Sequence, residues 1–214
     1  MSKIKFFELP EGLRNTQMER GPKGFREFSG KEIDFLRKNI KADSVILDVG
    51  CGWGKHISIL SKNARVVFGI DSSVLMIKKA KEYLMGLKNV KLFLDDAEEM
   101  PFEDNFFDFV ICTRNTFGNM YNRRAVLREM KRVLKRTGKM FIGVYSEQAK
   151  DLQLEYYKAN GIKVIHITKS CVYALPDFKS GRFTKQRLKD IFKAGGLSAK
   201  IMPLNCSSHR HIAH

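Results

Sequence analysis

The stretch VILDVGCGWGK, residues 45–55, decides the fold. It opens with a short apolar run typical of a buried strand, and Gly50, Gly52 and Gly54 follow in the spacing GxGxG. Glycines after a strand let the backbone turn tightly and approach a ligand closely, at the start of the next helix. The stretch therefore predicts a strand, a ligand-binding loop and a helix.

Two common nucleotide-binding loops do not fit this spacing. The third glycine of a dinucleotide loop, GxGxxG, would fall on Lys55. In a phosphate-binding loop, GxxxxGK[ST], the first glycine would fall on Val49 and the hydroxyl on His56. Asp48 stands two residues before Gly50, and a carboxylate there favours a ligand with a positive group over a pyrophosphate.

Short apolar strands alternate with helices along the middle of the chain. This alternation is typical of a parallel sheet covered on both faces. We expect strands at residues 45–50, 65–71, 90–96, 106–113 and 139–146, with helices at 55–61, 73–84 and 121–136.

The two ends of the chain are less regular. Prolines and glycines predict an irregular segment over residues 1–28, and Ser29 and Glu32 fit a capping box that would start a helix. Towards the C-terminus we expect a helix at 147–160, a hairpin at 162–175, a helix capped by Thr184 that ends at Gly195, and strands near 197–204 and 207–213.

Acidic residues follow the ends of two further strands. Asp71 ends the second strand, where a carboxylate can accept two hydrogen bonds from a ribose diol. The third strand ends in Asp95-Asp96-Ala97, and either acid can accept a hydrogen bond from an adenine amino group. Together with Asp48, these acids indicate a nucleoside site without a phosphate.

At these motifs the sequence resembles the class I S-adenosylmethionine-dependent methyltransferases. VILDVGCGWG, VFGIDSS, DDAEEMPFEDNFFDFVIC and REMKRVLKRTGKMFIGVYS occur in order within residues 44–146, and RFTKQRLKDIFKAGGL resembles a later helix of the family. The resemblance implies a Rossmann-like α/β fold: a doubly wound, mostly parallel seven-stranded sheet with helices on both faces and an antiparallel last strand. We expect one domain over residues 1–214, with a donor-binding core at 44–146 and acceptor-side elements at 147–214.

The resemblance also implies which residues bind S-adenosylmethionine. It places Asp48 and the glycines near the methionine moiety, Asp71 at the ribose, and Asp96 and Ala97 at the adenine. The expected donor-binding residues are Asp48, Gly50, Cys51, Gly52, Gly54, Asp71, Ser72, Asp96, Ala97 and Thr113.

Other side chains near the expected site have two interpretations. Trp53 and His56 lie at the loop, either as ligand contacts or as packing residues. Arg114 and Asn115 follow the fourth strand and are the acceptor-side candidates, although a loop cap explains Asn115 equally. The RNTFGN sequence lacks the prolines that follow this position in amino-group methyltransferases of nucleic acids.

The expected reaction is direct in-line transfer of the sulfonium methyl group to a nitrogen, oxygen or carbon atom of a small molecule, which leaves S-adenosylhomocysteine. Two alternatives stay open: an RNA methyltransferase and a non-catalytic donor-binding subunit. The RNA alternative rests on a net charge of +16, most of which comes from residues 120–140 and 179–200. No residue is named as a catalytic base.

Composition restricts location and cofactors. Four widely spaced cysteines, Cys51, Cys112, Cys171 and Cys206, predict reduced thiols and no zinc site, and the histidines at 209, 211 and 214 lack the acid or cysteine that would complete a metal site. No apolar run approaches the roughly 18 residues of a membrane span, and no signal-peptide core stands at the start. We expect a cytoplasmic protein without a metal or a membrane partner, and its oligomeric state stays open. We also expect the N-terminal segment, with Phe25 and Phe28, to form a lid over the acceptor pocket.

Overall fold

The computed structural model describes residues 5–17, 21–205 and 210–213. The chain divides into two compact units, each described by itself below. Unit 1 comprises Met1–Glu32, Arg114–Met120 and Gly143–His214, and unit 2 comprises Ile33–Thr113 and Tyr121–Ile142. Two elements, α2 (Lys23–Asn39) and β5 (Leu134–Ser146), contribute residues to both units. The single domain over residues 1–214 stays a prediction.

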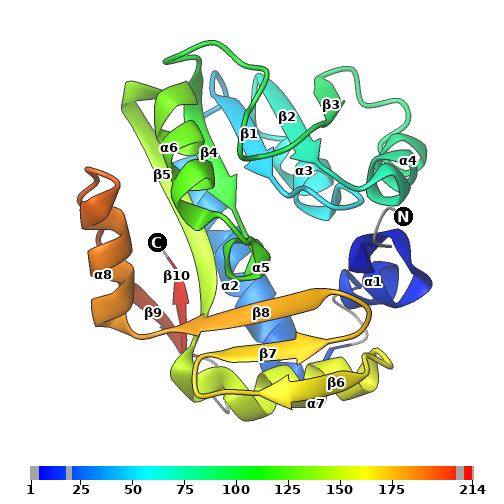
Figure 1. Cartoon of the computed structure of the whole chain (residues 1–214). Helices are drawn as coiled ribbons and strands as arrows, with labels where there is room; N and C mark the ends of the chain where they lie inside the picture. Colours follow the sequence, from blue (N-terminus) through cyan, green and yellow to red (C-terminus); the bar gives the residue numbers. More distant parts are fainter. Residues whose placement is uncertain (1–4, 18–20, 206–209, 214) are drawn as a thin grey trace. The chain divides into compact units, whose positions relative to one another are not determined.

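Unit 2 holds a parallel sheet in the order β3-β2-β1-β4-β5 (Figure 1). The order reverses between β1 and β4, so right-handed crossovers place α3 and α4 on one face and α6 on the other. This arrangement confirms the expected doubly wound α/β class. The elements are β1 (Val45–Val49), α3 (Lys55–Leu60), β2 (Val66–Asp71), α4 (Val74–Tyr83), β3 (Val90–Leu94), β4 (Phe107–Cys112), α6 (Arg123–Val133) and the first part of β5.

The strands and helices of unit 2 follow the periodicities read from the sequence. All five residues of β1 are buried, as expected for a central parallel strand. The apolar face predicted for the helix at 121–136 is confirmed for Val126, Leu127, Met130 and Val133. Ser73 caps α4, since its hydroxyl accepts a hydrogen bond from the Met76 amide at 3.1 Å.

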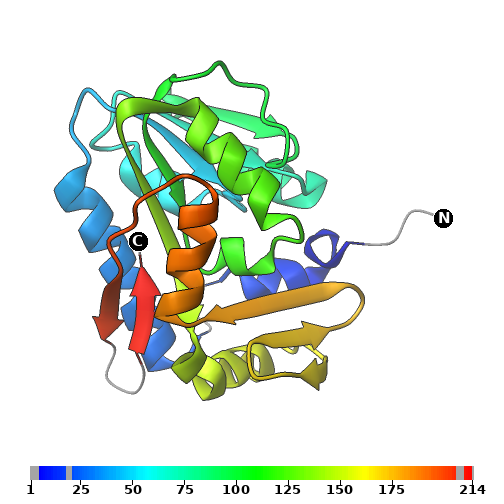
Figure 2. The same cartoon turned by 60° about the vertical axis from the view of Figure 1, so that its left-hand side comes forward.

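Unit 1 combines helices with short strands. The end of β5 pairs in parallel with β8, and β7 and β6 continue antiparallel from it. β10 pairs antiparallel with both β5 and β9, and Figure 2 shows these two short strands side by side. The elements are η1 (Phe6–Glu8), α1 (Pro10–Asn15), the first part of α2, α5 (Thr116–Asn119), the end of β5, η3 (Glu147–Ala149), α7 (Lys150–Ala159), β6 (Val164–Ile167), β7 (Cys171–Ala174), β8 (Phe178–Phe183), α8 (Lys185–Ala194), β9 (Met202–Asn205) and β10 (Arg210–Ala213).

Unit 1 contains the strands in which the structure differs from the prediction. The hairpin predicted at 162–175 is confirmed as β6 and β7, and an antiparallel strand near the C-terminus is confirmed as β10. The described residues hold ten strands, where the resemblance implied seven and the residue patterns predicted nine. The strand that neither predicted is β8, which extends the hairpin into a three-stranded meander.

The expectation of an irregular segment over residues 1–28 is wrong for its described part. Pro10 occupies the first turn of α1, where its missing N–H costs nothing, and α2 already begins at Lys23. Ser29 and Glu32 lie inside α2 and are fully buried, so they do not form the predicted capping box. The helix begins early because burial of its first turns in the core of unit 1 outweighs the local breakers.

Aromatic side chains form the centre of the unit 1 core. The Phe25 and Tyr156 rings stack with centroids 3.8 Å apart, and Phe28 lies 5.8 Å from Tyr145. Phe25 and Phe28 are at most 1% exposed. Their burial explains them as packing residues, and a lid role stays a prediction.

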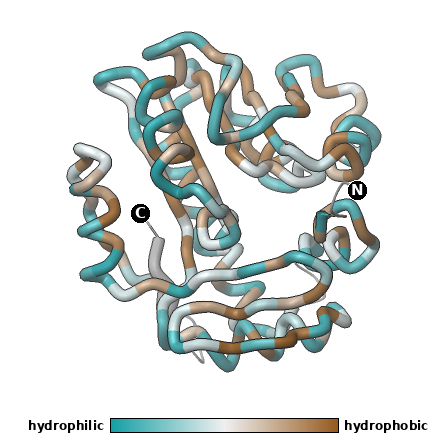
Figure 3. Tube along the Cα trace, viewed as in Figure 1, coloured by the Kyte–Doolittle hydropathy of each residue, from teal (hydrophilic) through white to brown (hydrophobic). Residues whose placement is uncertain are grey.

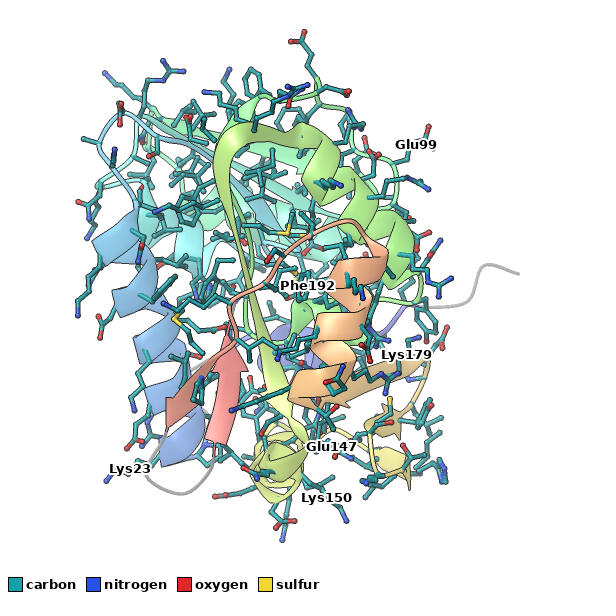
Figure 4. All side chains as sticks on the ribbon, turned by 90° about the vertical axis from the view of Figure 1, so that its left-hand side faces the viewer. Lys23, Glu99, Glu147, Lys150, Lys179 and Phe192 are labelled. Atoms are coloured by element: carbon teal, nitrogen blue, oxygen red, sulfur yellow. The ribbon has the colours of Figure 1, made fainter. Side chains whose placement is uncertain are left out.

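The C-terminal helix α8 has the boundaries expected from its caps. The Thr184 hydroxyl accepts a hydrogen bond from the Arg187 amide at 3.0 Å, and the helix ends at Gly195. Phe192, labelled in Figure 4, anchors the helix, with its ring 6.5 Å from that of Phe117.

Candidate functional site

The three loop glycines have backbone conformations that other residues rarely adopt. Gly50, Gly52 and Gly54 have φ values of 70°, 54° and 88°. Gly54 is the N-cap of α3, and an added Cβ would lie 2.5 Å from a methyl carbon of Leu84. The carboxyl end of β1 thus carries a tight loop that favours glycine at these three positions, with Gly54 buried against Leu84.

Asp71 fixes this loop against the end of β2. Its Oδ2 accepts a hydrogen bond from the Gly52 amide at 2.8 Å, and its Oδ1 accepts one from the Ser73 amide at 3.0 Å. These two hydrogen bonds hold the Asp71 carboxylate at the end of β2, beside the glycine loop.

Asp48 is a buried carboxylate without a partner. Its side chain is 1% exposed, and neither carboxylate oxygen has a hydrogen-bond partner among the described residues. Burial raises the pKa of this carboxyl to about 7, and the Asp71 carboxylate adds to the effect. A buried acid costs free energy unless a positive group pairs with it, so the site fits a cationic ligand.

Asp48 should make the stability of the ligand-free chain fall as pH rises. The pKa of an Asp carboxyl is about 3.9 in an unfolded chain, whereas burial raises the pKa of Asp48 to about 7 in the folded chain. Between these values the folded state keeps a proton that the unfolded state has lost, so the free energy of unfolding decreases by about 4 kcal/mol and then levels off.

Urea unfolding across this pH range measures the effect. Asp48→Asn should remove this part of the pH dependence, while Asp43→Asn, at an exposed acid of the same unit, should keep it. Parallel profiles for the wild type and Asp48→Asn would show that the carboxylate is not buried as described.

Trp53 and His56, which stand beside the glycines in the sequence, each pack against another side chain of unit 2. His56 is buried in the first turn of α3, with its Nδ1 3.4 Å from the Thr113 hydroxyl oxygen. The Trp53 ring lies edge-on to Tyr83 with centroids 4.8 Å apart, and the Lys55 ammonium lies 5.0 Å from the Trp53 centroid. The His56–Thr113 contact was not predicted, although a polar ring directly after the loop was the available signal.

The end of β3 presents its acids to solvent. Asp95 and Asp96 are exposed, and Ala97 is partly exposed. The Asp96 amide donates to Asp95 Oδ1 at 2.9 Å, and Asp96 Oδ1 accepts from the Glu98 amide at the same distance. Which acid would face an adenine stays open. Ser72 is exposed, and Cys51 is buried in the loop with its thiol pKa raised by burial.

Arg114 and Asn115 belong to unit 1 and are held there. Asn115 is 1% exposed, and its amide nitrogen donates to the Ser180 hydroxyl at 2.9 Å and to the Gly181 carbonyl at 3.1 Å. Its Oδ1 accepts from the Tyr145 amide at 2.9 Å. This amide is occupied by the protein, which supports the structural interpretation of Asn115.

Arg114 makes contacts of the same kind. Its guanidinium donates to the Thr16 carbonyl at 2.6 Å and lies 5.4 Å from the Phe25 ring centroid. Its backbone amide faces the two carboxylate oxygens of Glu32, each at 3.3 Å. Sequence reasoning missed Glu32 because its partners are far away in the chain.

Part of the basic excess is used within the protein. Arg132 donates to Glu129 at 2.7 Å, to Asp104 at 2.8 Å and to backbone carbonyls, and the bonded guanidinium lowers the Glu129 pKa. Lys135 pairs with Asp108 at 2.7 Å. Arg182 is fully buried in unit 1 and donates to Gln153 and to two carbonyls. These cations are not available for a polyanion.

Neither a metal site nor a membrane-spanning helix occurs among the described residues. Within them, no group of three or more His, Cys, Asp or Glu residues is arranged to hold a metal ion. Cys51, Cys112 and Cys171 are free thiols, and Cys206 and the histidines at 209, 211 and 214 lie outside the described side chains. No helix in the described ranges has the length and apolarity needed to cross a bilayer.

Comparison with known proteins identifies the part of the chain that carries the loop. A family model described as a methyltransferase domain matches residues 47–142. Residues 47–142 are a methyltransferase domain. The match runs from the end of β1 through the glycine loop and Asp71 to the middle of β5, which confirms the resemblance to the S-adenosylmethionine-dependent methyltransferase family.

Relatives of this methyltransferase domain align with only part of the chain. Demethylmenaquinone methyltransferase of Staphylococcus aureus (strain MRSA252) is 44% identical over 108 residues, which are 48% of this chain and 42% of that protein. The chain spans about half the length of the curated relatives it matches.

Solved structures share the fold. A SAM-dependent methyltransferase from Methanosarcina mazei aligns with a TM-score of 0.61 and 20% identity, covering 84% of this chain and 93% of that one. The Burkholderia thailandensis 1,6-didemethyltoxoflavin-N1-methyltransferase, with 1,6-didemethyltoxoflavin and S-adenosylhomocysteine bound, aligns with a TM-score of 0.64 and 12% identity over 86% of this chain and 74% of that one.

Proposed function

We propose that the chain is an enzyme that transfers the methyl group of S-adenosylmethionine to a nitrogen, oxygen or carbon atom of a small molecule. The observation that carries the proposal is the Asp48 carboxylate, buried and without a partner beside the glycine loop of a methyltransferase domain. A buried anion of this kind fits a donor that carries positive charge.

The chain's own residues then bind and orient the donor. Asp48 balances its positive charge, and the backbone at Gly50, Gly52 and Gly54 gives close access at the end of β1. Asp71, held beside the loop by the Gly52 and Ser73 amides, accepts hydrogen bonds from the ribose hydroxyls. The further proposed contacts are Cys51, Ser72, Asp96, Ala97 and Thr113.

S-adenosylmethionine supplies a methyl group that the sulfonium charge has already activated. The protein needs to align an acceptor lone pair with that carbon and exclude water. A base is required only where the acceptor must lose a proton before attack. Arg114 and Asn115 stay acceptor-side predictions, and their contacts within unit 1 suit them to shape the end of β4 rather than to move a proton.

A small-molecule acceptor is supported by the substrates after which two relatives are named. One acts on a demethylated menaquinone and another holds 1,6-didemethyltoxoflavin. RNA is less well supported, because Arg132, Lys135 and Arg182 from the basic stretches are engaged within the protein. Free buried thiols support a reducing compartment, and a cytoplasmic location belongs to the proposal.

Transfer from methyl-labelled S-adenosylmethionine tests the acceptor class. The chain is incubated with labelled donor and a cell extract, which is then separated into lipid, water-soluble small-molecule, RNA and protein fractions. We expect label in one of the first two fractions, and less of it with Asp48→Asn when the donor concentration is limiting. Label in RNA or protein would contradict the proposal, and donor binding without any label would favour a non-catalytic subunit.

Asp71→Ala should weaken donor binding by about 1–3 kcal/mol through the loss of charge-assisted hydrogen bonds. Trp53 is the single tryptophan of the chain and lies in the loop, so its fluorescence reports a donor titration directly. Asp43→Ala, at an exposed acid of the same unit, should leave the affinity unchanged. If Asp71→Ala binds the donor as tightly as the wild type, the ribose does not lie at Asp71.

A further inference from the structure

The hairpin of β6 and β7 in unit 1, together with Leu175 directly after it, exposes large apolar side chains. Ile165 is 56% exposed, Ile167 39%, Tyr173 38% and Leu175 45%. Figure 3 shows the hydrophobic colour along these two strands. Monomeric proteins rarely expose contiguous apolar surface without a binding partner. We call Ile165, Ile167, Tyr173 and Leu175 the hairpin patch.

The strand register does not put the whole hairpin patch on one face, because Ile167 lies opposite the buried Val172. Tyr173 pairs across the hairpin with His166, and their ring centroids are 5.7 Å apart. The Leu175 amide donates to the Lys163 carbonyl at 3.2 Å. Val172 and Ala174 alternate with the exposed residues and are buried in the core, so the hairpin is anchored from its other side.

Positive charge surrounds the hairpin patch. Residues 158–179 contain four lysines and one acidic residue. Lys158, Lys163 and Lys169 are exposed, and Lys179, labelled in Figure 4, extends from β8 next to β7. Lysines keep the ammonium in water while their stems cover apolar surface, which suits a boundary between water and hydrocarbon.

We propose that the hairpin patch and its lysines adsorb to the surface of an anionic phospholipid bilayer. Aliphatic side chains and a tyrosine would enter the interface, and the lysines would pair with anionic headgroups. The sequence-based expectation of no membrane partner rested on the lack of a spanning segment, and adsorption to a surface needs none.

Two other occupants fit the hairpin patch less well. A second copy of the chain carries the same charge of +16 and is repelled, and β6 is short, begins after Lys163 and has an irregular register between Val164 and His166. Short, charged and irregular edges disfavour strand-to-strand pairing. Nucleic acid is less suitable because isoleucine and leucine offer no stacking face for bases.

Vesicle flotation with the whole chain tests the proposal. We expect binding to vesicles in which about a third of the lipid is phosphatidylglycerol, little binding to pure phosphatidylcholine, and weaker binding at high salt because screening removes the attraction. Absence of binding to the anionic vesicles at low salt would overturn the proposal.

Paired variants locate the contact. Ile165→Ser with Ile167→Ser, and separately Lys163→Gln with Lys169→Gln, should each weaken partitioning about tenfold. The control for the first pair is Met85→Ser with Leu87→Ser, and the control for the second is Lys81→Gln with Lys88→Gln. These residues are also exposed and lie on α4 or directly after it, so both controls should bind vesicles as the wild type does. Circular dichroism checks that all variants fold.

Three results would overturn the assignment. The first is full vesicle binding by the Ile165→Ser, Ile167→Ser variant. The second is equal weakening by the control pairs, which would indicate attraction by net charge alone. The third is loss of RNA binding, with vesicle binding intact, in the Lys163→Gln, Lys169→Gln variant, which would assign the lysines to nucleic acid.

Discussion

Asp48→Asn should weaken binding of S-adenosylmethionine by about 1.5–3 kcal/mol, roughly 10- to 100-fold, because it removes the buried negative charge that faces the donor. The same change should raise the free energy of unfolding of the ligand-free chain at about pH 8 by about 1–3 kcal/mol, since no ionised group is then buried. Calorimetric titration measures the first effect and urea unfolding the second.

The opposite signs of these two effects separate a binding role from a structural one. A residue that only supports the fold would lose stability and affinity together. Asp43→Asn should change neither quantity, because that acid is exposed. The loss of affinity should be smaller for S-adenosylhomocysteine, whose sulfur carries no positive charge. Unchanged donor affinity in Asp48→Asn would contradict the assignment of the site.

Gly143→Ala should destabilise the chain by about 2–3 kcal/mol through overpacking. An added Cβ at Gly143 would overlap Glu32 Oε1, and Glu32 is fully buried with its carboxylate against the Arg114 amide. The side chain therefore has no free space to move into. Thermal and urea unfolding measure the loss.

A second glycine of unit 1 provides the matched control. Gly30 lies within α2 with no atom within 4 Å of an added Cβ, so Gly30→Ala should stabilise the chain by about 0.5–1 kcal/mol. Combining Gly143→Ala with Glu32→Ala should cost less than the sum of the two single changes, because the clash disappears. Additive costs would show that the contact is not as described.

Local patterns in the sequence were sufficient for the parallel half of the fold. The mostly apolar run VILDV before GxGxG predicts β1 and its loop, and the helical period over residues 121–136 predicts the buried face of α6. Ser73 and Thr184 predict helix starts because capping is a contact within one turn. Each of these signals depends on residues close together in the chain.

Contacts between distant residues were not predictable in the same way. The breakers before residue 23 suggested an irregular start, yet Phe25 stacks on Tyr156 and α2 begins there. Likewise, Glu32 fits a capping box in the sequence, whereas its carboxylate faces the Arg114 amide. A local pattern contains no information about a partner 82 or more residues away, and such packing outweighs local preference.

The candidate site also contains features that the local sequence predicted and features that it did not. Residue types and spacing indicated Asp48, Asp71 and the glycines, because each follows directly from a strand end. That Asp71 bonds the Gly52 amide, or that Thr113 lies beside His56, depends on how neighbouring strands and helices pack. The sequence could therefore indicate the donor side, and it left Asn115 open between two interpretations.

Calorimetric titration of S-adenosylmethionine and S-adenosylhomocysteine into the whole chain tests the central claim most directly. We predict that each binds once per chain, that S-adenosylmethionine loses more affinity than S-adenosylhomocysteine in Asp48→Asn, and that Asp43→Asn binds both as the wild type does. Failure of both molecules to bind the folded wild-type chain would contradict the claim that the glycine loop and Asp48 form a methyl-donor site.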